Sequence, residues 1–394
     1  MKKIFFPLLF AALTLAQGTA GAWGFFGHRT ITQVAVYQLP ASMQAFYYRH
    51  MAELVRLSTA PDERRSQDTT EGPKHFINMD YYSEENPFAK VPRRYEKAVE
   101  KFTADTLKKY GTVPWTIIET KNSLTEAFRQ RDTVNIIKYS AELSHYMSDA
   151  FVPLHTTLNY DGQFTNQKGL HKLWETQLPE RFINEYKLNG EPAKYLDNPL
   201  VAVWNEVQQS YGFVGETFDQ ATKIEKVMKP AVRYTFAHHY GQTTRRFSDA
   251  FADAYEKAVG GMVSFRLKGA PTMVSSLWLT AWQDAGKPDL NSLMIPNKQT
   301  KSEKEKLSVE MAAWKNNTLP HSQLLLAQQK EKKEEIVDEI KSATEDIADP
   351  TKEGQDGAPA GTAGEPAPAA NKLKVKTKGK EGTQKIKQKG DAPQ

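Results

Sequence analysis

The chain contains no cysteine among its 394 residues. It therefore has no disulfide, no lipidated N-terminal cysteine and no cysteine nucleophile. No apolar run in the sequence is long enough to span a bilayer. A Gly-rich phosphate loop and a Gly-x-Ser-x-Gly elbow are also missing. These absences exclude phosphate-loop enzymes and the common serine and cysteine hydrolases.

The first 22 residues have the pattern of a secretory signal. Lys2 and Lys3 precede an apolar run over residues 4–16, and Ala20-Gly21-Ala22 follows as a small-residue cleavage site. We therefore expect cleavage after Ala22, a mature protein that begins at Trp23, and export to the periplasm or the medium.

The formal net charge of +5 does not indicate a basic groove. Two positive charges come from Lys2 and Lys3, and four come from residues 351–394, where nine lysines face five acidic residues. Residues 23–350 are left with about −1. Overall charge therefore gives no evidence for or against nucleic-acid binding by the core.

Apolar periodicity predicts an all-α fold in a single domain over residues 23–288. Helical patterns occur in 30–38, 43–57, 94–110 and 117–148, and a helix that ends at Gly286 with Pro288 beyond it closes the domain. Few segments alternate between apolar and polar residues as strands do, so the sequence does not favour a sheet. We expect a linker over 289–303, a charged helical segment of low core content over 304–349, and a disordered basic tail over 350–394.

Histidines and acids in one short stretch carry the strongest functional signal. His145 and Asp149 are four residues apart, His155 follows Pro153, and His171 and Glu175 are again four apart. Residues four apart project from the same face of a helix. Imidazole nitrogen and carboxylate oxygen are ligands that zinc prefers. The stretch predicts a site for more than one zinc ion.

Further candidate ligands lie nearer the N-terminus. Cleavage after Ala22 would free the amine of Trp23, which can chelate a metal together with its own carbonyl oxygen, and His28 follows about a turn later. Asp62 and His75 complete the candidate set.

In order and type, these residues resemble the ligands of a known superfamily. It comprises the single-strand-specific zinc nucleases, of the mung bean nuclease type, and the bacterial zinc-dependent phospholipases C. The likeness covers about residues 23–288 and implies an all-α domain with three zinc ions in a cleft. The matching residues are Trp23, His28, Asp62, His75, His145, Asp149, His155, His171 and Glu175.

The resemblance also implies how the ligands are shared. One zinc would be held by Asp62, His75, His145 and Asp149, and a second by His155, His171 and Glu175. The third would be held by the amine and carbonyl of Trp23, by His28 and by Asp149 as a bridge.

The resemblance predicts phosphodiester hydrolysis by a zinc-bridged hydroxide. Asp62 would orient the attacking water, and Arg65 is placed to clamp the phosphate. Phe76 and Asn78 hold the positions at which the nucleases stack and hydrogen-bond a base. We therefore expect an endonuclease that acts on single-stranded DNA or RNA and has no obligate protein partner.

Two other functions are compatible with the sequence. Glu175 as the last ligand, and the short gap from His155 to His171, resemble the phospholipases and indicate a phospholipid substrate. Alternatively, zinc serves only as a structural staple in a binding protein. The shared Asp149 argues against a staple, because a bridging acid implies metals close together.

Overall fold

The computed structural model describes residues 23–239 and 242–329. The predicted signal, residues 330–349 of the charged segment and the predicted tail lie outside the described residues. The described part is mostly helical, which confirms the predicted fold class. Its α-helices are α1 (Phe25–Tyr37), α2 (Ala41–Arg49), α3 (Met51–Leu57), α4 (Ala60–Arg64), α5 (Pro87–Lys90), α6 (Tyr95–Phe102), α7 (Ala104–Tyr110), α8 (Val113–Gln130), α9 (Thr133–Asp149), α10 (Leu170–Lys172), α11 (Leu178–Phe182), α12 (Pro199–Gly212), α13 (Val214–Val227), α14 (Asp249–Asp284) and α15 (Lys301–Lys315).

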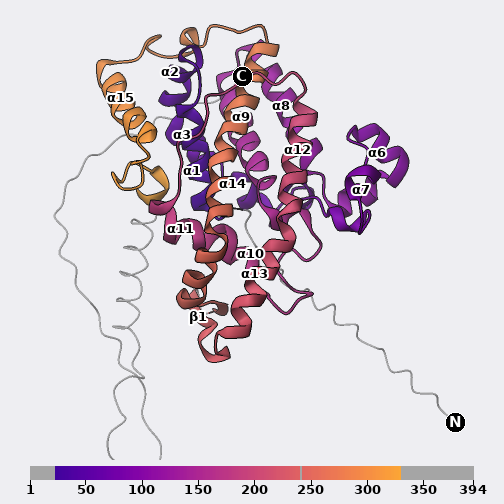
Figure 1. The fold of residues 1–394 in the computed structure, drawn as a ribbon. Coiled ribbons are helices and arrows are strands. Elements are labelled where there is room, and N and C mark those ends of the chain that lie inside the picture. The colour runs from indigo at the N-terminus through magenta and orange to yellow at the C-terminus, as the bar shows by residue number, and fades with distance from the viewer. Residues whose placement is uncertain (1–22, 240–241, 330–394) are drawn as a thin grey trace, which may run out of the picture. The chain divides into compact units, whose positions relative to one another are not determined.

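The core is a bundle in which α1, α8, α9 and α14 pack against one another (Figure 1). All residues of α1 except Phe25 are buried, as expected for a helix that is surrounded by others. The long helix α14 runs beside it and contributes buried aromatic side chains such as Trp278. This arrangement encloses the N-terminal helix, so that His28 lies inside the protein.

The predicted helical segments form, but capping residues divide three of them. The segment 117–148 separates into α8 and α9 because Arg131 adopts a left-handed conformation and the Asp132 side chain caps α9. In the segment 94–110, Thr103 has a positive φ and its hydroxyl caps α7. The segment 43–57 divides into α2 and α3 at His50.

One hairpin interrupts the helical fold between α13 and α14. Strand β1 (Tyr234–His239) pairs antiparallel with β2 (Gln242–Phe247), with Tyr234 opposite Phe247. These strands were not predicted from the sequence. Among the described residues, no helix combines the length and apolar character needed to cross a membrane.

Beyond the domain end predicted at Pro288, residues 289–329 continue to pack on the bundle. Helix α15 packs on α1, and residues 289–329 bury six large side chains. These are Leu290, Met294, Leu307, Trp314, Leu319 and Leu325. The segment is fixed by polar contacts as well: Arg49 Nε lies 2.8 Å from Glu303 Oε1, and Trp314 Nε1 donates to Leu188 O at 3.0 Å. Residues 289–303 and the start of the charged segment therefore belong to the same core.

Candidate metal centre

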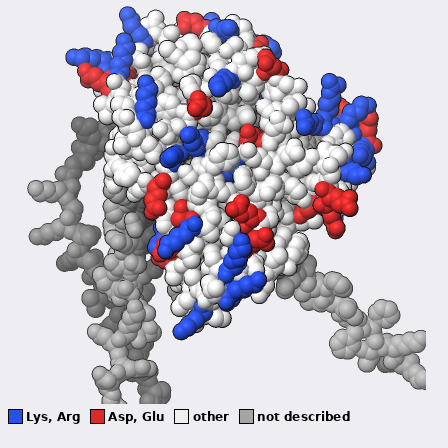
Figure 2. Space-filling model, in the orientation of Figure 1, with Lys and Arg blue, Asp and Glu red and all other residues white. Residues whose placement is uncertain are grey.

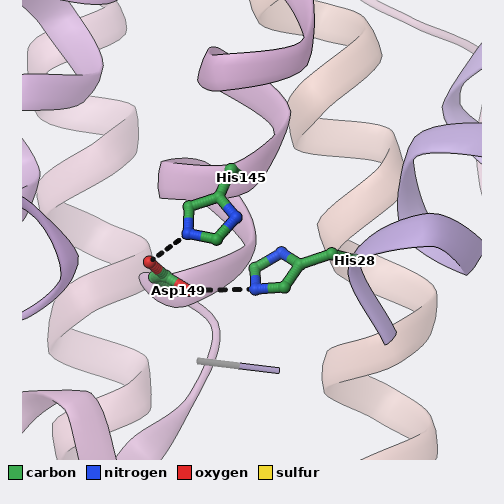
Figure 3. A group of neighbouring side chains, drawn as sticks. All are labelled: His28, His145 and Asp149. Carbon is green, nitrogen blue, oxygen red and sulfur yellow. Dashed lines mark ion pairs between the residues drawn. The ribbon is translucent and has the colours of Figure 1, made fainter. Parts of the chain in front are cut away.

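The last two turns of α9 form the middle of the site. His145 and Asp149 lie on one face of this helix and are fully buried, as their spacing predicted. His28 approaches from α1, where its ring stacks on that of His145 with 4.0 Å between centroids. Its Nε2 atom lies 3.4 Å from Asp149 Oδ1 (Figure 3). Two helices far apart in sequence therefore direct imidazoles at one carboxylate.

A second pair of ligand candidates faces the other oxygen of Asp149. His75 Nδ1 lies 3.0 Å from Asp149 Oδ2 and 3.7 Å from Asp62 Oδ1. His145 Nε2 lies 3.0 Å from His75 Nδ1, 3.5 Å from Asp149 Oδ2 and 3.9 Å from Asp62 Oδ1. Tetrahedral zinc with bonds of about 2.0–2.1 Å separates its ligand atoms by about 3.4 Å. The separations that involve the two imidazole nitrogens, 3.0–3.9 Å, are therefore close to this spacing.

Hydrogen bonds fix which imidazole nitrogen is available to a metal. His145 Nδ1 lies 2.7 Å from Ser58 O, and His155 Nδ1 lies 2.6 Å from His75 O. A carbonyl oxygen can only accept, so both Nδ1 atoms carry the proton. The Nε2 atoms are then unprotonated and face the other ligand candidates.

Glu71 supports His75 from behind. Its carboxylate is fully buried, and its Oε1 lies 3.4 Å from His75 Nε2, the ring nitrogen that faces away from Asp149. Arg64 Nε donates to Glu71 Oε2 at 2.8 Å, Lys74 Nζ donates to the same oxygen at 3.1 Å, and the Tyr146 hydroxyl also donates to Glu71. Burial raises the pKa of Glu71, but the hydrogen bonds from His75, Arg64 and Tyr146 outweigh it, and the net shift is downward. Glu71 is therefore an ionised partner that can orient His75.

His155, His171 and Glu175 form a further group of ligand candidates, next to those around Asp149. His171 Nε2 lies 2.8 Å and His155 Nε2 lies 3.5 Å from Glu175 Oε2. All three atoms are buried, and none makes a hydrogen bond of acceptable geometry. Glu175 lies in a single π-helical turn, Leu173–Gln177, a distortion that is frequent at functional sites. Convergent buried atoms without hydrogen bonds are what a bound cation would satisfy.

Burial keeps the imidazoles of the site neutral. It lowers the pKa of His75, His155 and His171 to about 4 in each case, and it places that of His145 well below the usual range. Burial has the opposite effect on the acids, because it raises the pKa of Glu175 to about 7 and that of Asp149 well above its usual range. Neutral imidazoles are ready to bind a metal, and a cation would stabilise the ionised carboxylates.

Trp23 is anchored between the ligand-bearing segments. Its indole is fully buried, packs against Trp174 at 5.0 Å between centroids, and donates from Nε1 to Ser148 O at 2.8 Å. The next residue, Gly24, donates its N–H to Glu175 O at 3.2 Å. The first residue of the predicted mature chain is therefore held beside Asp149 and Glu175.

Together, eight of the nine predicted ligands converge through their side chains. They fall into three groups, and within each group the ligand atoms lie within 4.8 Å of one another. The groups are His28, His145 and Asp149; Asp62, His75 and His145; and His155, His171 and Glu175. The donor set of nitrogen and carboxylate oxygen fits zinc.

The site opens into a cavity of about 590 Å³. His75, His155 and His171 form part of its wall. The predicted substrate residues Arg65, Phe76 and Asn78 line it as well, and Arg65 Nη1 lies 3.4 Å from Asp62 Oδ1. A substrate in this cavity would therefore touch both the metal ligands and the residues predicted to hold a phosphate and a base.

The family model of the S1/P1 nucleases matches residues 23–277 of this chain. The chain belongs to the S1/P1 nuclease family. Members are zinc-dependent phosphodiesterases that cleave single-stranded nucleic acid, which confirms the predicted resemblance and class of enzyme. The family match gives no support to the phospholipase alternative. No curated protein matches the chain.

Three further residues of this S1/P1 nuclease site were not among the predicted ones. Lys109 and Tyr160 line the cavity, and the Tyr160 ring lies 6.0 Å from that of His171. Nothing in their local sequence marks them. Glu71 was missed as well, although it stands four residues before His75, the spacing that drew attention to the other pairs.

Proposed function

We propose that this S1/P1 nuclease is an exported endonuclease that cleaves single-stranded DNA and RNA with three zinc ions. One observation carries the proposal: His28 faces one oxygen of Asp149, and His75 and His145 face the other. A shared carboxylate keeps neighbouring cations close together, as a phosphodiesterase needs, whereas isolated structural sites have no such bridge.

The ligands are assigned as the resemblance implies. One zinc ion is held by Asp62, His75, His145 and Asp149, and the second by His155, His171 and Glu175. The third is held by His28, Asp149 and the main chain of Trp23, whose amine is free only after cleavage following Ala22. The anchored indole of Trp23 supports this last assignment, because it fixes the start of the mature chain beside Asp149.

Bound zinc lowers the pKa of a coordinated water and neutralises charge on the phosphate. The chain's own residues orient the reactants. The Asp62 carboxylate accepts a hydrogen bond from the attacking water and aligns it with the phosphorus. The Arg65 guanidinium, 3.4 Å from Asp62, donates to a non-bridging phosphate oxygen.

Single-strand preference follows from the cavity wall. The Phe76 ring provides a face for a base to stack on, and the Asn78 amide provides a donor and an acceptor for its edge. A base can reach both only when it is unpaired and unstacked. Duplex nucleic acid is therefore a poor substrate.

The proposal is tested with the purified mature protein, beginning at Trp23. Single-stranded DNA, RNA, duplex DNA and phosphatidylcholine vesicles are each incubated with and without a chelator. We expect nucleotides from the single strands only, and none after chelation. Release of phosphocholine without nucleotides would refute the nuclease function, and metal content without turnover on any of these would indicate a structural role for zinc.

A further inference from the structure

A positively charged segment projects from the bundle beside the cavity. We name residues 87–110 the basic arm; it contains α5, α6 and α7, and of these α6 and α7 stand away from the central helices (Figure 1). It has seven basic residues and three acidic residues, a net charge of +4. Residues 23–329 together carry +3, so the rest of this range carries about −1. The basic arm is therefore a local concentration of positive charge on a nearly neutral domain.

Most of this charge is available to a ligand. Arg93, Arg94, Lys101, Lys108 and the other basic residues of the arm are exposed. Among the ion pairs of the described residues, only one involves a cation of the arm, the pair between Lys97 and Glu100 at 2.8 Å. Figure 2 shows Lys and Arg side chains gathered on this projection, with acidic side chains along its lower margin. Unpaired surface cations are free to bind phosphates.

The end of the basic arm is joined to the cavity wall. Asn78 donates its N–H to Tyr110 O at 2.7 Å, and Thr112 donates its N–H to Pro73 O at 2.7 Å. Gly111 between them has a φ of 98°, and a Cβ there would lie 2.1 Å from Phe76 O. Only glycine allows this approach. The arm is therefore fixed to the segment that carries the predicted base-binding residues.

Aromatic rings continue from the cavity onto the arm. Tyr81 stacks on Tyr110, and 42% of its surface is exposed. Lys109 lines the cavity and holds its Nζ 5.2 Å from the centre of the Tyr110 ring. Cations interleaved with exposed aromatic rings are the combination that binds single-stranded nucleic acid without sequence preference.

We propose that the basic arm binds the single strand where it leaves the cavity, with Lys101 and Lys108 on its phosphates and Tyr81 under a base. This inference rests on the proposed nuclease function. In that function, the metal centre and its cavity hold one nucleotide. Binding by the arm as well would make the enzyme prefer long strands over short ones.

The test compares two double variants of the mature full-length protein. Lys101→Gln with Lys108→Gln removes two charges from the arm. The matched control, Lys138→Gln with Lys257→Gln, removes two exposed charges from α9 and α14, away from the arm and the cavity. For each protein, kcat/KM is measured on a single strand of about 20 nucleotides and on a dinucleotide, over a range of salt concentrations.

Each lost phosphate contact reduces the slope of log(kcat/KM) against log salt by about 0.7 for a single strand. We expect the arm variant to lose about 1.4 from the slope on the long strand, which is about a sevenfold smaller loss of activity between about 50 and 200 mM salt. The control keeps the wild-type slope. Equal slopes for the arm variant and the wild type, or equal changes in both variants, would overturn the inference while the nuclease function stands. A wild type that cleaves neither substrate would overturn both.

Discussion

Replacing Glu71 by Gln tests whether the zinc ligands depend on residues behind them. Glu71 accepts hydrogen bonds from Arg64, Lys74 and Tyr146, and its Oε1 lies 3.4 Å from His75 Nε2. Glutamine keeps the shape of the Glu71 side chain but removes its negative charge. Its amide N–H group then faces groups that are themselves hydrogen-bond donors. A hydrogen bond to a charged group contributes about 1.5–3 kcal/mol. The Arg64 and Lys74 side chains are 31% and 34% exposed, so water weakens these contacts, and we expect the variant to lose about 2 kcal/mol in free energy of unfolding.

The expected decrease in zinc affinity is larger than a general loss of protein stability would cause. Partners of a metal-bound histidine change metal affinity by about 10- to 100-fold. We therefore expect zinc titration of the Glu71→Gln protein to show one site weakened by that factor, while the remaining zinc binds as in the wild type. Zinc content after dialysis against a weak chelator gives a second measurement that does not depend on activity.

Glu142→Gln is the matched control. Glu142 Oε1 lies 2.9 Å from Arg64 Nη1, so this variant also removes a negative charge from Arg64, but Glu142 does not pair with a ligand candidate. We expect about 1 kcal/mol of destabilisation and unchanged zinc affinity. If both variants bound zinc as the wild type does, the role assigned to Glu71 would be refuted. Equal weakening in both would mean that Arg64, not the contact with His75, carries the effect.

Two further substitutions and one N-terminal extension probe the framework of the site. Arg266 is fully buried and donates to Phe151 O at 3.0 Å, on the turn between the ligands of α9 and the next histidine. We therefore expect Arg266→Met to lower the free energy of unfolding by about 3–5 kcal/mol, as measured by denaturant titration. Gly111→Ala forces a methyl group against Phe76 O, and thermal unfolding should show a loss of more than about 2 kcal/mol. One alanine left before Trp23 blocks the proposed amine ligand, so metal analysis should find one zinc fewer; full zinc content in that protein would rule out the chelate.

The ligand set could be predicted from the sequence because its strongest signals are local. His145 and Asp149, and likewise His171 and Glu175, share a helical face through their spacing alone. The structure keeps both relations, although a π-helical turn carries Glu175. The distribution of ligands among the three ions came from the resemblance and not from spacing, and it stays a prediction.

Other parts of the site could not be predicted from local sequence patterns, because segments that are distant in the chain form them. His75 meets Asp149 across 74 positions of the chain, and the hydrogen bond that fixes the tautomer of His145 comes from Ser58, 87 positions away. Lys109 reaches the cavity only because Gly111 allows the arm to approach Phe76. Such contacts follow from tertiary packing, which periodicity does not report.

The packing of residues 289–329 on the bundle was beyond local patterns as well. Helix α15 is rich in Lys and Glu and buries only Leu307, Ala313 and Trp314, so its pattern resembles that of a solvated helix. Specific contacts hold it instead: Glu310 accepts a hydrogen bond from the Tyr37 hydroxyl at 2.8 Å, on the helix that also carries His28. A few well-placed contacts can fix a helix whose average composition is polar.

Removal of the metal is expected to weaken the fold as well as stop the reaction. The site buries Asp149 near other acids, and after burial itself the charges of Asp62 and then Glu175 raise the pKa of Asp149 further. Zinc present at about 1,000 times its dissociation constant stabilises a folded protein by about 4 kcal/mol per site. At about 2 °C per kcal/mol for a domain of this size, one site corresponds to about 8 °C in Tm. Calorimetry with and without chelator measures this shift, and re-added zinc should restore it. A chelated protein with an unchanged Tm would mean that these buried acids and imidazoles do not bind a cation, because no bound ion could leave them without a loss of stability.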